Sequence, residues 1–390
     1  MKLLWVKADF LHPTDRGGQI RTLEMLKRMK RRHEIHYVGL KRGDPSRAGE
    51  YCARAYAIEF RETAKDSPAF AGQLIKGMFS RLPVAVSRYR SDAMKRQLET
   101  LAREQRFDAK VCDFLFPAPN VPDLSECVLF QHNVEATIWK RHTENARSAL
   151  HRWYFRKQAR RMEEYEGEVC RAVRRVIAVS EIDAEEMRRT YRAARVDAIP
   201  TGVDVDWFTP SGAVGRSADL VFIGSMDWMP NIDGALWFAR DILPLIRTRK
   251  PDCSVVFAGR RPGHTLLELA REDSRIQVTG TVPDVRPYLW GATASIVPLR
   301  IGGGTRLKIF ESMAAGVPVI STKIGAEGLP VEPDSQILIA DEPAAFAEFC
   351  VRLMEDVAAR TRMALAAREL VASRFSWEAV SVEFERLLLS

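Results

Sequence analysis

A glycine loop links an apolar run to a helical pattern in the segment Ser295-Ile-Val-Pro-Leu-Arg-Ile-Gly-Gly-Gly-Thr-Arg-Leu-Lys-Ile-Phe-Glu311. Apolar residues then recur at helical spacing from Leu307 to Ala314, and Gly316 ends the pattern. A strand–loop–helix unit of this kind leaves backbone N–H groups free at the helix N-terminus, with the positive end of the helix dipole behind them. We therefore expect this loop to bind an anion.

Three side chains in the same segment suit a nucleoside diphosphate. Arg306 and Lys308 add positive charge, which favours phosphate. Glu311 lies one turn along the helix, where a carboxylate can accept two hydrogen bonds from a vicinal diol such as ribose. The alternative is an ordinary strand-to-helix turn in which Arg306 and Lys308 are only solvated.

The chain of 390 residues is long enough for two domains of ordinary size, and its 46% apolar content is ample for packed cores. Its charge is uneven. Residues 1–200 contain 39 Lys and Arg against 27 Asp and Glu, a net charge of +12, whereas residues 201–390 have a net charge of −4. The basic half could serve nucleic acid, an anionic membrane surface or a phosphorylated substrate.

The six cysteines are scattered, with no Cys-x-x-Cys pair and no histidines at zinc spacing. This pattern predicts free thiols in a reducing cytosol and no metal ligands. The start of the chain, Met1–Asp9, is too short and too charged for a signal peptide, and no run approaches the ~20 apolar residues that span a bilayer. We expect a cytoplasmic protein, with any membrane contact peripheral and on the inner face.

Short β-branched runs alternate with longer helical patterns along the whole chain. Most of these runs are continuously apolar, as parallel strands covered on both faces are. The expected strands are Leu3–Ala8, Glu34–Gly39, Ala55–Phe60, Ala109–Phe114, Cys127–Phe130, Val176–Val179, Leu220–Ile223, Ser254–Ala258, Arg275–Thr279, Ala294–Val297, Pro318–Ser321 and Gln336–Ala340. The alternation predicts an α/β protein of two doubly wound domains, joined near the small-residue segment Thr209–Gly215.

Further candidate residues follow predicted strands, where ligands of such domains bind. Gly17 and Gly18 follow the first strand and would let a ligand approach the backbone closely, although a Gly-Gly turn is common. His132 follows a mid-domain strand, and its alternative role is a strand-end histidine paired with backbone. Gly224 and Ser225 open the second domain.

In their order and spacing these segments resemble the GT-B-fold nucleotide-sugar glycosyltransferases, specifically the large retaining family 4 group. The shared features are the Gly-Gly loop, His132, Val179-Ser180 before a helix, Gly202-Val-Asp204, Phe222-Ile-Gly224, Glu311 and Ala315-Gly-Val-Pro-Val-Ile320. The resemblance covers almost the whole chain. It implies two Rossmann-like domains facing a central cleft, with a final helix, Trp377–Leu388, crossing back onto the N-terminal domain.

The resemblance also implies a division of labour. Residues 1–205, with the crossing helix 376–390, would form the acceptor-side domain, and residues 206–375 would bind the nucleotide sugar. The implied reaction moves a sugar from a nucleoside diphosphate, with UDP favoured over GDP, to a glycan or lipid-linked glycan, with retention at the anomeric carbon. It needs no cofactor and no metal ion, and nucleic acid is not a partner.

Preorganised amides and cations aimed at the departing diphosphate should dominate catalysis, because that group gains negative charge. The groups that would supply them are Gly17, Gly18, Gly224, Ser225, Gly303, Gly304, Thr305, Arg306 and Lys308. His132 would contact the donor sugar or position the acceptor hydroxyl, and Glu311 would bind the ribose. Together, His132, Arg306 and Lys308 form the expected catalytic set.

The sequence departs from the family pattern in two places. Gly303 stands where the family usually carries the first of two glutamates. Ser225 and the neighbourhood of Asn231, a candidate helix cap, stand where Arg and Lys are common. Arg306 and Lys308 look like the replacement cations, and this variant resembles a bacterial subgroup associated with exopolysaccharide assembly.

Two segments, Gln73–Arg106 and Trp139–Arg161, combine apolar and basic residues and could lie on anionic lipid; the alternative is a solvated helix face. Two other functions compete. A sugar-nucleotide epimerase on the same scaffold would turn over its substrate without an acceptor. A non-enzymatic nucleic-acid-binding protein would need aromatic stacking platforms among its basic residues, whereas these glycine loops are placed for a diphosphate.

Overall fold

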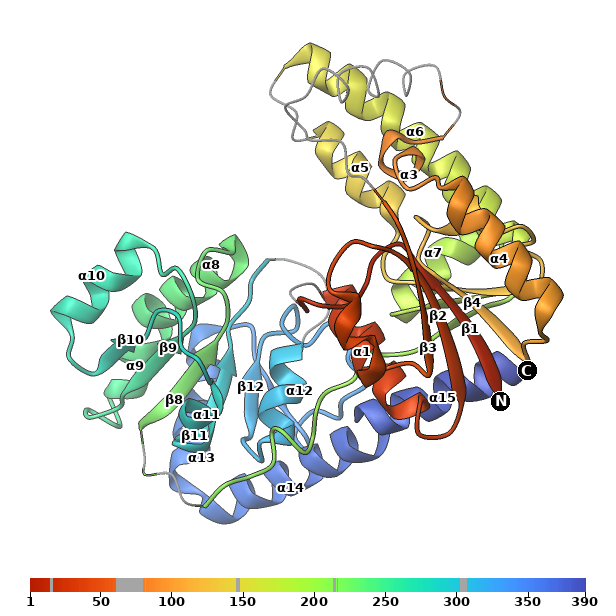
Figure 1. The fold of residues 1–390 in the computed structure, drawn as a ribbon. Helices are drawn as coiled ribbons and strands as arrows, with labels where there is room; N and C mark the ends of the chain where they lie inside the picture. Colours follow the sequence, from red (N-terminus) through yellow and green to blue (C-terminus); the bar gives the residue numbers. More distant parts are fainter. Residues whose placement is uncertain are drawn as a thin grey trace. The chain divides into compact units, whose positions relative to one another are not determined.

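The computed structural model describes residues 1–14, 17–60, 80, 82–144, 148–212, 215, 217–301 and 307–390. The chain forms two compact units (Figure 1). Unit 1 contains Met1–Pro200 and Val380–Ser390, and unit 2 contains Thr201–Ala379. Each unit has one parallel β-sheet packed against helices, which confirms the predicted α/β class with two Rossmann-like domains.

The sheet of unit 1 has the strand order β3-β2-β1-β4-β5-β6-β7. Its strands are β1 (Lys2–Lys7), β2 (Glu34–Leu40), β3 (Arg54–Ile58), β4 (Ala109–Asp113), β5 (Cys127–Gln131), β6 (Arg175–Ala178) and β7 (Val196–Ala198). Its helices are α1 (Gly17–Met29), α3 (Val84–Ser87), α4 (Asp92–Glu104), α5 (Glu135–Glu144), α6 (Ala149–Ala172) and α7 (Glu181–Tyr191). The strand order reverses between β1 and β4, so the topological switch point lies there.

The core of unit 1 forms because its central strands are apolar on both faces. All of β5 is buried, and so is β1 from Leu3 onward, as expected for parallel strands between helices. The final helix, α15 (Trp377–Leu389), supplies part of this core. The ring of Phe384 lies 5.6 Å from Trp5 and 5.0 Å from Phe130, centroid to centroid. The end of the last helix thus belongs to unit 1.

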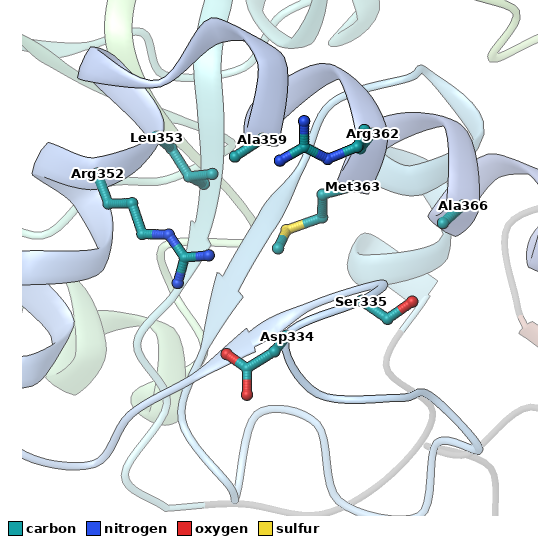
Figure 2. A pocket seen from close by; sticks show the side chains of 8 residues that line it. All are labelled: Asp334, Ser335, Arg352, Leu353, Ala359, Arg362, Met363 and Ala366. Carbon is teal, nitrogen blue, oxygen red and sulfur yellow. The ribbon is translucent and has the colours of Figure 1, made fainter.

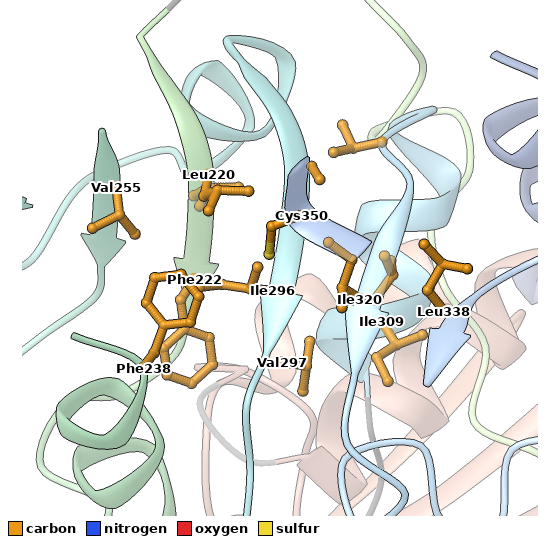
Figure 3. Close-up of a cluster of buried hydrophobic side chains, with 14 of the residues drawn as sticks. Leu220, Phe222, Phe238, Val255, Ile296, Val297, Ile309, Ile320, Leu338 and Cys350 are labelled. Atoms are coloured by element: carbon orange, nitrogen blue, oxygen red, sulfur yellow. The ribbon is translucent and has the colours of Figure 1, made fainter. Parts of the chain in front are cut away.

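The sheet of unit 2 has the order β10-β9-β8-β11-β12-β13, with its switch point between β8 and β11. Its strands are β8 (Ala218–Ile223), β9 (Val255–Ala258), β10 (Ile276–Val278), β11 (Ala292–Val297), β12 (Val319–Ser321) and β13 (Leu338–Ile339). Its helices are α8 (Met229–Trp237), α9 (Leu243–Arg247), α10 (His264–Glu272), α11 (Arg286–Trp290), α12 (Leu307–Ala314), α13 (Pro343–Glu355) and α14 (Val357–Arg374). Phe222, Phe238, Ile296 and Cys350 lie in its core (Figure 3).

Each predicted strand is present, with its ends shifted by one or two residues. Unit 2 starts at Thr201, so the expected join between the domains, Thr209–Gly215, starts within unit 2 rather than between the two units. Residues just before it already pair with the end of that unit, because Val203 N donates to Phe375 O at 2.7 Å. A Cβ at Gly202 would lie 2.4 Å from the Trp377 ring, so only glycine allows this approach.

Candidate functional site

Three central strands of unit 1 lead into polar side chains at the same edge of the sheet. Lys7 is the last residue of β1, Asp113 is the last residue of β4, and His132 follows β5. Lys7 and Asp113 are partners in the β1–β4 register, so they lie side by side. This edge contains the switch point, where doubly wound sheets bind ligands.

Asp113 is fully buried and accepts four hydrogen bonds. Its Oδ1 atom accepts from Lys7 Nζ at 2.5 Å and from His132 Nε2 at 2.7 Å. Its Oδ2 atom accepts from Thr22 Oγ1 at 2.7 Å and from Trp5 Nε1 at 2.8 Å. Burial opposes ionisation, but Lys7, His132 and the hydrogen bonds outweigh it and hold the pKa of Asp113 well below its usual range.

His132 lies in this network and is neutral at neutral pH. Burial lowers its pKa to about 4; Asp113 opposes the shift, and the positive charges of Lys7 and Arg21 add to it. Arg21 Nη1 lies 3.4 Å from His132 Nδ1, and the ring of Phe130 packs at 4.6 Å between centroids. The side chain is therefore paired with Asp113 rather than with backbone.

Gly17 and Gly18, predicted to lie in a loop, instead form the start of α1, and Gly18 lies beside this histidine. α1 begins at Gly17, and a Cβ at Gly18 would lie 3.6 Å from Cγ of His132. A Cβ at Gly17 would meet nothing within 4 Å in the part of the chain that the structure describes. Packing of those described residues therefore does not require a glycine at position 17, whereas a ligand approaching the backbone would.

In unit 2, Lys308 extends from α12 to the end of β8. Its Nζ atom donates to Asn231 Oδ1 at 2.6 Å and lies 4.6 Å from the ring centroid of Phe222. A Cβ at Gly224 would lie only 3.1 Å from that Nζ atom. Asn231 Nδ2 in turn donates to Ser225 O at 2.9 Å. Lys308 thus places a cation in the neighbourhood where the sequence lacks the expected ones.

The prediction of Asn231 as a helix cap is wrong. α8 begins at Met229 after Trp228, which makes no side-chain capping bond, so Asn231 lies within the first turn. Its amide instead links Ser225 O to Lys308. The amide oxygen of Asn231 is therefore used to orient the lysine.

Glu311 lies one turn after Lys308 on α12 and is half-buried. Burial raises its pKa to about 7, and the positive charge of Lys308 opposes the rise. No group among the described residues donates a hydrogen bond to its carboxylate. The predicted loop residues Gly303, Gly304, Thr305 and Arg306 lie outside the described residues.

Sequence reasoning missed most of the unit 1 network, above all Lys7 and Asp113. The available signal was a charged residue at the carboxyl end of a continuously apolar strand, the edge where ligands were expected. Lys7 fits that description after the run Leu3–Val6, whereas the signal for Asp113 is weaker because β4 also contains Lys110. The six cysteines are free and buried, as predicted.

The described ranges contain neither a candidate metal site nor a candidate membrane-spanning helix. No group of three or more His, Cys, Asp or Glu side chains in those ranges could hold a metal ion. None of the helices there is both long and apolar enough to cross a bilayer.

A pocket of about 260 Å³ in unit 2 lies apart from these residues (Figure 2). Its walls come from α13, α14 and the turn before β13, and its lining residues are Asp334, Ser335, Arg352, Leu353, Ala359, Arg362, Met363 and Ala366. No predicted site residue is among them. The pocket is therefore not part of the site at the strand ends.

Two family descriptions match this chain, one in each half. Residues 16–207 match Glycosyltransferase Family 4, and residues 217–356 match Glycosyl transferases group 1. O-antigen chain mannosyltransferase B of Escherichia coli is 25% identical, covering 97% of each chain. D-inositol 3-phosphate glycosyltransferase of Paenarthrobacter aurescens is 28% identical, covering 60% of this chain and 62% of that one. The chain spans about half the length of several such relatives, from 43% to 62%.

Solved structures show the same fold. Sucrose-phosphate synthase from Thermosynechococcus elongatus has a TM-score of 0.65 at 16% identity, covering 99% of this chain and 98% of that one. HepE of Anabaena, in complex with UDP-glucose, has a TM-score of 0.62 at 15% identity, covering 100% and 99%. With a family match in each half and this fold along its whole length, the chain belongs to the group 1, family 4 glycosyltransferases of GT-B fold.

Proposed function

We propose that this glycosyltransferase is a retaining, metal-independent hexosyltransferase that uses a nucleoside diphosphate sugar, with UDP favoured over GDP, and no separate cofactor. The observation that carries the proposal is Lys308, whose ammonium group lies beside Gly224 at the carboxyl end of β8. A cation next to side-chain-free backbone suits a diphosphate. The UDP-glucose bound to HepE, a protein of the same fold, supports this donor class.

The proposed chemistry depends on charge. As the bond between the sugar and the diphosphate breaks, negative charge develops on the departing oxygen, and fixed cations stabilise it most effectively. Lys308 and Arg306 would supply these cations, with amides of the loop before α12. Because these side chains would do the work of a divalent ion, activity should survive EDTA.

We propose a glycan or lipid-linked glycan as the acceptor, in surface polysaccharide assembly. The O-antigen chain mannosyltransferase, aligned over 97% of both chains, supports this acceptor class. We propose that the anomeric configuration is retained because the sequence resembles the retaining family 4 group. The anomeric configuration of the product, read from its proton coupling constants by NMR, tests it: inversion would contradict this part of the proposal alone.

The central experiment is a donor screen of the full chain, with release of free nucleoside diphosphate as the readout. UDP-sugars should release UDP only when an acceptor glycan is present, and Lys308→Ala should abolish most of the release. Nucleotide-sugar turnover without an acceptor would favour an epimerase. A rise in melting temperature with oligonucleotide but not with UDP would favour nucleic-acid binding.

We further propose that α5 and α6 contact an anionic membrane surface on the cytoplasmic side. The two helices pack together and extend beyond the sheet of unit 1 (Figure 1). Near the start of α6, Leu150 is 72% exposed and Trp153 is 53% exposed, with Lys157 Nζ 5.4 Å from the Trp153 ring. Arg152 and Arg156 are exposed on the same helix. Apolar anchors among basic side chains suit anionic lipid.

Vesicle flotation tests the membrane contact. The full chain should bind vesicles of anionic lipid, bind neutral vesicles less, and dissociate as salt shortens the Debye length from its value of about 8–10 Å. The double variant Leu150→Ser, Trp153→Ser should lose binding. Ile182→Ser, which removes an equally exposed apolar residue from α7, should not. The second expected basic segment, Gln73–Arg106, lies partly outside the described residues.

A further inference from the structure

We infer that Asp113 and Lys7 are positioning residues that fix His132 as its neutral Nε2–H tautomer, so that Nδ1 is a hydrogen-bond acceptor and the ring is not a general base. The inference deepens the proposed function. It rests on that function only for the hydroxyl that Nδ1 would accept from, because the tautomer itself depends on the protein alone.

Nε2 of His132 carries a proton because the carboxylate of Asp113 is ionised. An ionised carboxylate can only accept hydrogen bonds, and three other donors, including the ammonium of Lys7, already point at Asp113. His132 Nε2 lies 2.7 Å from Asp113 Oδ1, a distance that requires a proton on the imidazole side. The carboxylate therefore selects the tautomer.

The groups that surround Nδ1 indicate that this nitrogen carries a lone pair and no proton. Arg21 Nη1 lies 3.4 Å from Nδ1, and a guanidinium group can only donate. Burial lowers the pKa of Arg21 to about 10, with Asp113 and Asp183 opposing the shift, so Arg21 remains a cation at neutral pH. A Cβ at Gly18 would lie 3.8 Å from Nδ1, so this atom lies beside the first turn of α1.

The same neighbours exclude a role as general base. A base would have to take a proton on Nδ1, and the resulting imidazolium would have Lys7 Nζ 3.5 Å from one nitrogen and Arg21 Nη1 3.4 Å from the other. In a histidine–aspartate pair built for proton abstraction, the carboxylate stabilises the imidazolium. Here Asp113 already neutralises Lys7 and is shared with Thr22.

The consequence for transfer is a specific proton route. In the proposed retaining reaction the bond from the acceptor oxygen to the sugar forms while the bond from the sugar to the diphosphate breaks. In this scheme the acceptor proton passes to the departing diphosphate oxygen, which gains negative charge as its bond to the sugar breaks, and not to His132. A sugar hydroxyl would replace Arg21 Nη1, 3.4 Å away, as the donor to the single lone pair of Nδ1, while Asp113 holds the ring in place.

NMR of the full chain labelled with ¹⁵N-histidine tests the tautomer without any substrate. The chain has seven histidines, and His132→Gln identifies the signals of His132. From about pH 8 to about pH 5.5, His132 should show one protonated nitrogen, Nε2, and one unprotonated nitrogen, Nδ1. Asp113→Asn should lose the fixed tautomer and lower kcat roughly tenfold to a hundredfold with little change in donor KM.

Asp108→Asn is the matched control. Asp108 lies just before β4, is exposed and accepts a hydrogen bond from Lys2 N at 2.7 Å, so its loss should leave the His132 signals and kcat unchanged. If Asp113→Asn does not fold, Trp5→Phe removes one donor to the carboxylate and should shift the same signals. An Nδ1–H tautomer or an imidazolium at pH 7 in the wild-type chain overturns the inference, even if transfer is confirmed. A failure to find transfer would leave the tautomer result intact.

Discussion

Two carboxylates, Asp113 at the end of β4 and Glu311 on α12, differ in their surroundings. Asp113 in unit 1 accepts four hydrogen bonds and has a pKa well below its usual range. Glu311 in unit 2 receives no hydrogen bond from the described residues, and burial raises its pKa to about 7. The protein supplies four hydrogen-bond donors to the first carboxylate, whereas the described residues supply none to the second.

This difference distinguishes a carboxylate that positions a neighbouring side chain, Asp113, from one proposed to bind a ligand, Glu311. Burial without hydrogen-bond donors disfavours the ionised form of a carboxyl group, and groups with perturbed pKa values cluster at functional sites. The Asp113 network holds His132 in one orientation whether or not a ligand is present. Glu311, in contrast, receives no hydrogen bond from the described residues, and in the proposed function it accepts from the donor ribose. Four predictions test this contrast.

The largest effect is expected from Asp113→Ala. Removing the carboxylate leaves the ammonium of Lys7 buried without its counter-charge, which should cost about 3–5 kcal/mol of unfolding free energy. Glu311→Ala removes a carboxylate that burial already disfavours, so it should change stability by about 1 kcal/mol or less. Urea unfolding of both variants at pH 7.5 measures this, and equal losses would remove the basis of the comparison.

The second prediction concerns acid and His132. The unfolded chain takes up a proton near pH 6.5, whereas the folded ring does so near 4, so the contribution of His132 is complete above about pH 6.5 and is lost as pH falls toward 4. At about 1.4 kcal/mol per pKa unit, the loss approaches about 3 kcal/mol. Urea unfolding between pH 7 and pH 5 should show a steeper decline for wild type than for His132→Gln. Parallel curves would show that the ring is not held neutral.

The third prediction concerns Lys308→Ala. If its ammonium binds the diphosphate, UDP affinity should fall by about 1.5–3 kcal/mol, the range for hydrogen bonds to charged groups, while uridine affinity barely changes. Calorimetry measures both. Lys323→Ala, which removes an exposed lysine paired with Asp341 in the same unit, should alter neither. Equal losses for UDP and uridine would show that Lys308 supports the fold of unit 2 rather than the phosphates.

The fold was largely predictable because parallel strands covered on both faces are continuous apolar runs that stand out in the sequence. The strand that was missed, β7, shows the limit. It has three residues, Val196–Ala198, with Asp197 in the middle, and pairing with β6 at the edge of the sheet defines it. Its pattern is too short to show a period.

Candidate site residues could be predicted only where a single segment of the sequence contains the pattern that marks them. The position of Lys308 after a glycine-rich segment made it a candidate, and His132 became one by its place after a strand. The partners of these residues come from far away in the chain. Lys7 and Asp113 are 106 residues apart, and Lys308 and Asn231 are 77 apart. Such pairs depend on which strands are neighbours, and strand order is not a local property of the sequence.

The fourth prediction concerns Glu311 and the donor ribose. An ionised Glu311 can accept from both ribose hydroxyls, so losing this contact should cost about 1–3 kcal/mol of donor affinity, with Glu311→Ala worse than Glu311→Gln. Wild type should discriminate against a 2′-deoxy donor and Glu311→Ala should not. Competition binding with the two donors measures this, and circular dichroism checks that the fold is intact.

The raised pKa of Glu311 gives the ribose contact a pH signature. Because the carboxyl titrates near 7, its ionised fraction, and with it donor affinity, should rise about tenfold from pH 6 to pH 8. A nucleoside diphosphate sugar lacks a terminal phosphate that titrates in this window, so the donor does not obscure the effect. Glu311→Gln should bind equally at both pH values. If the donor affinity of wild type is also the same at both pH values, or if Glu311→Ala still discriminates against the deoxy donor, Glu311 is a structural residue of its helix. The ribose is then bound by other residues.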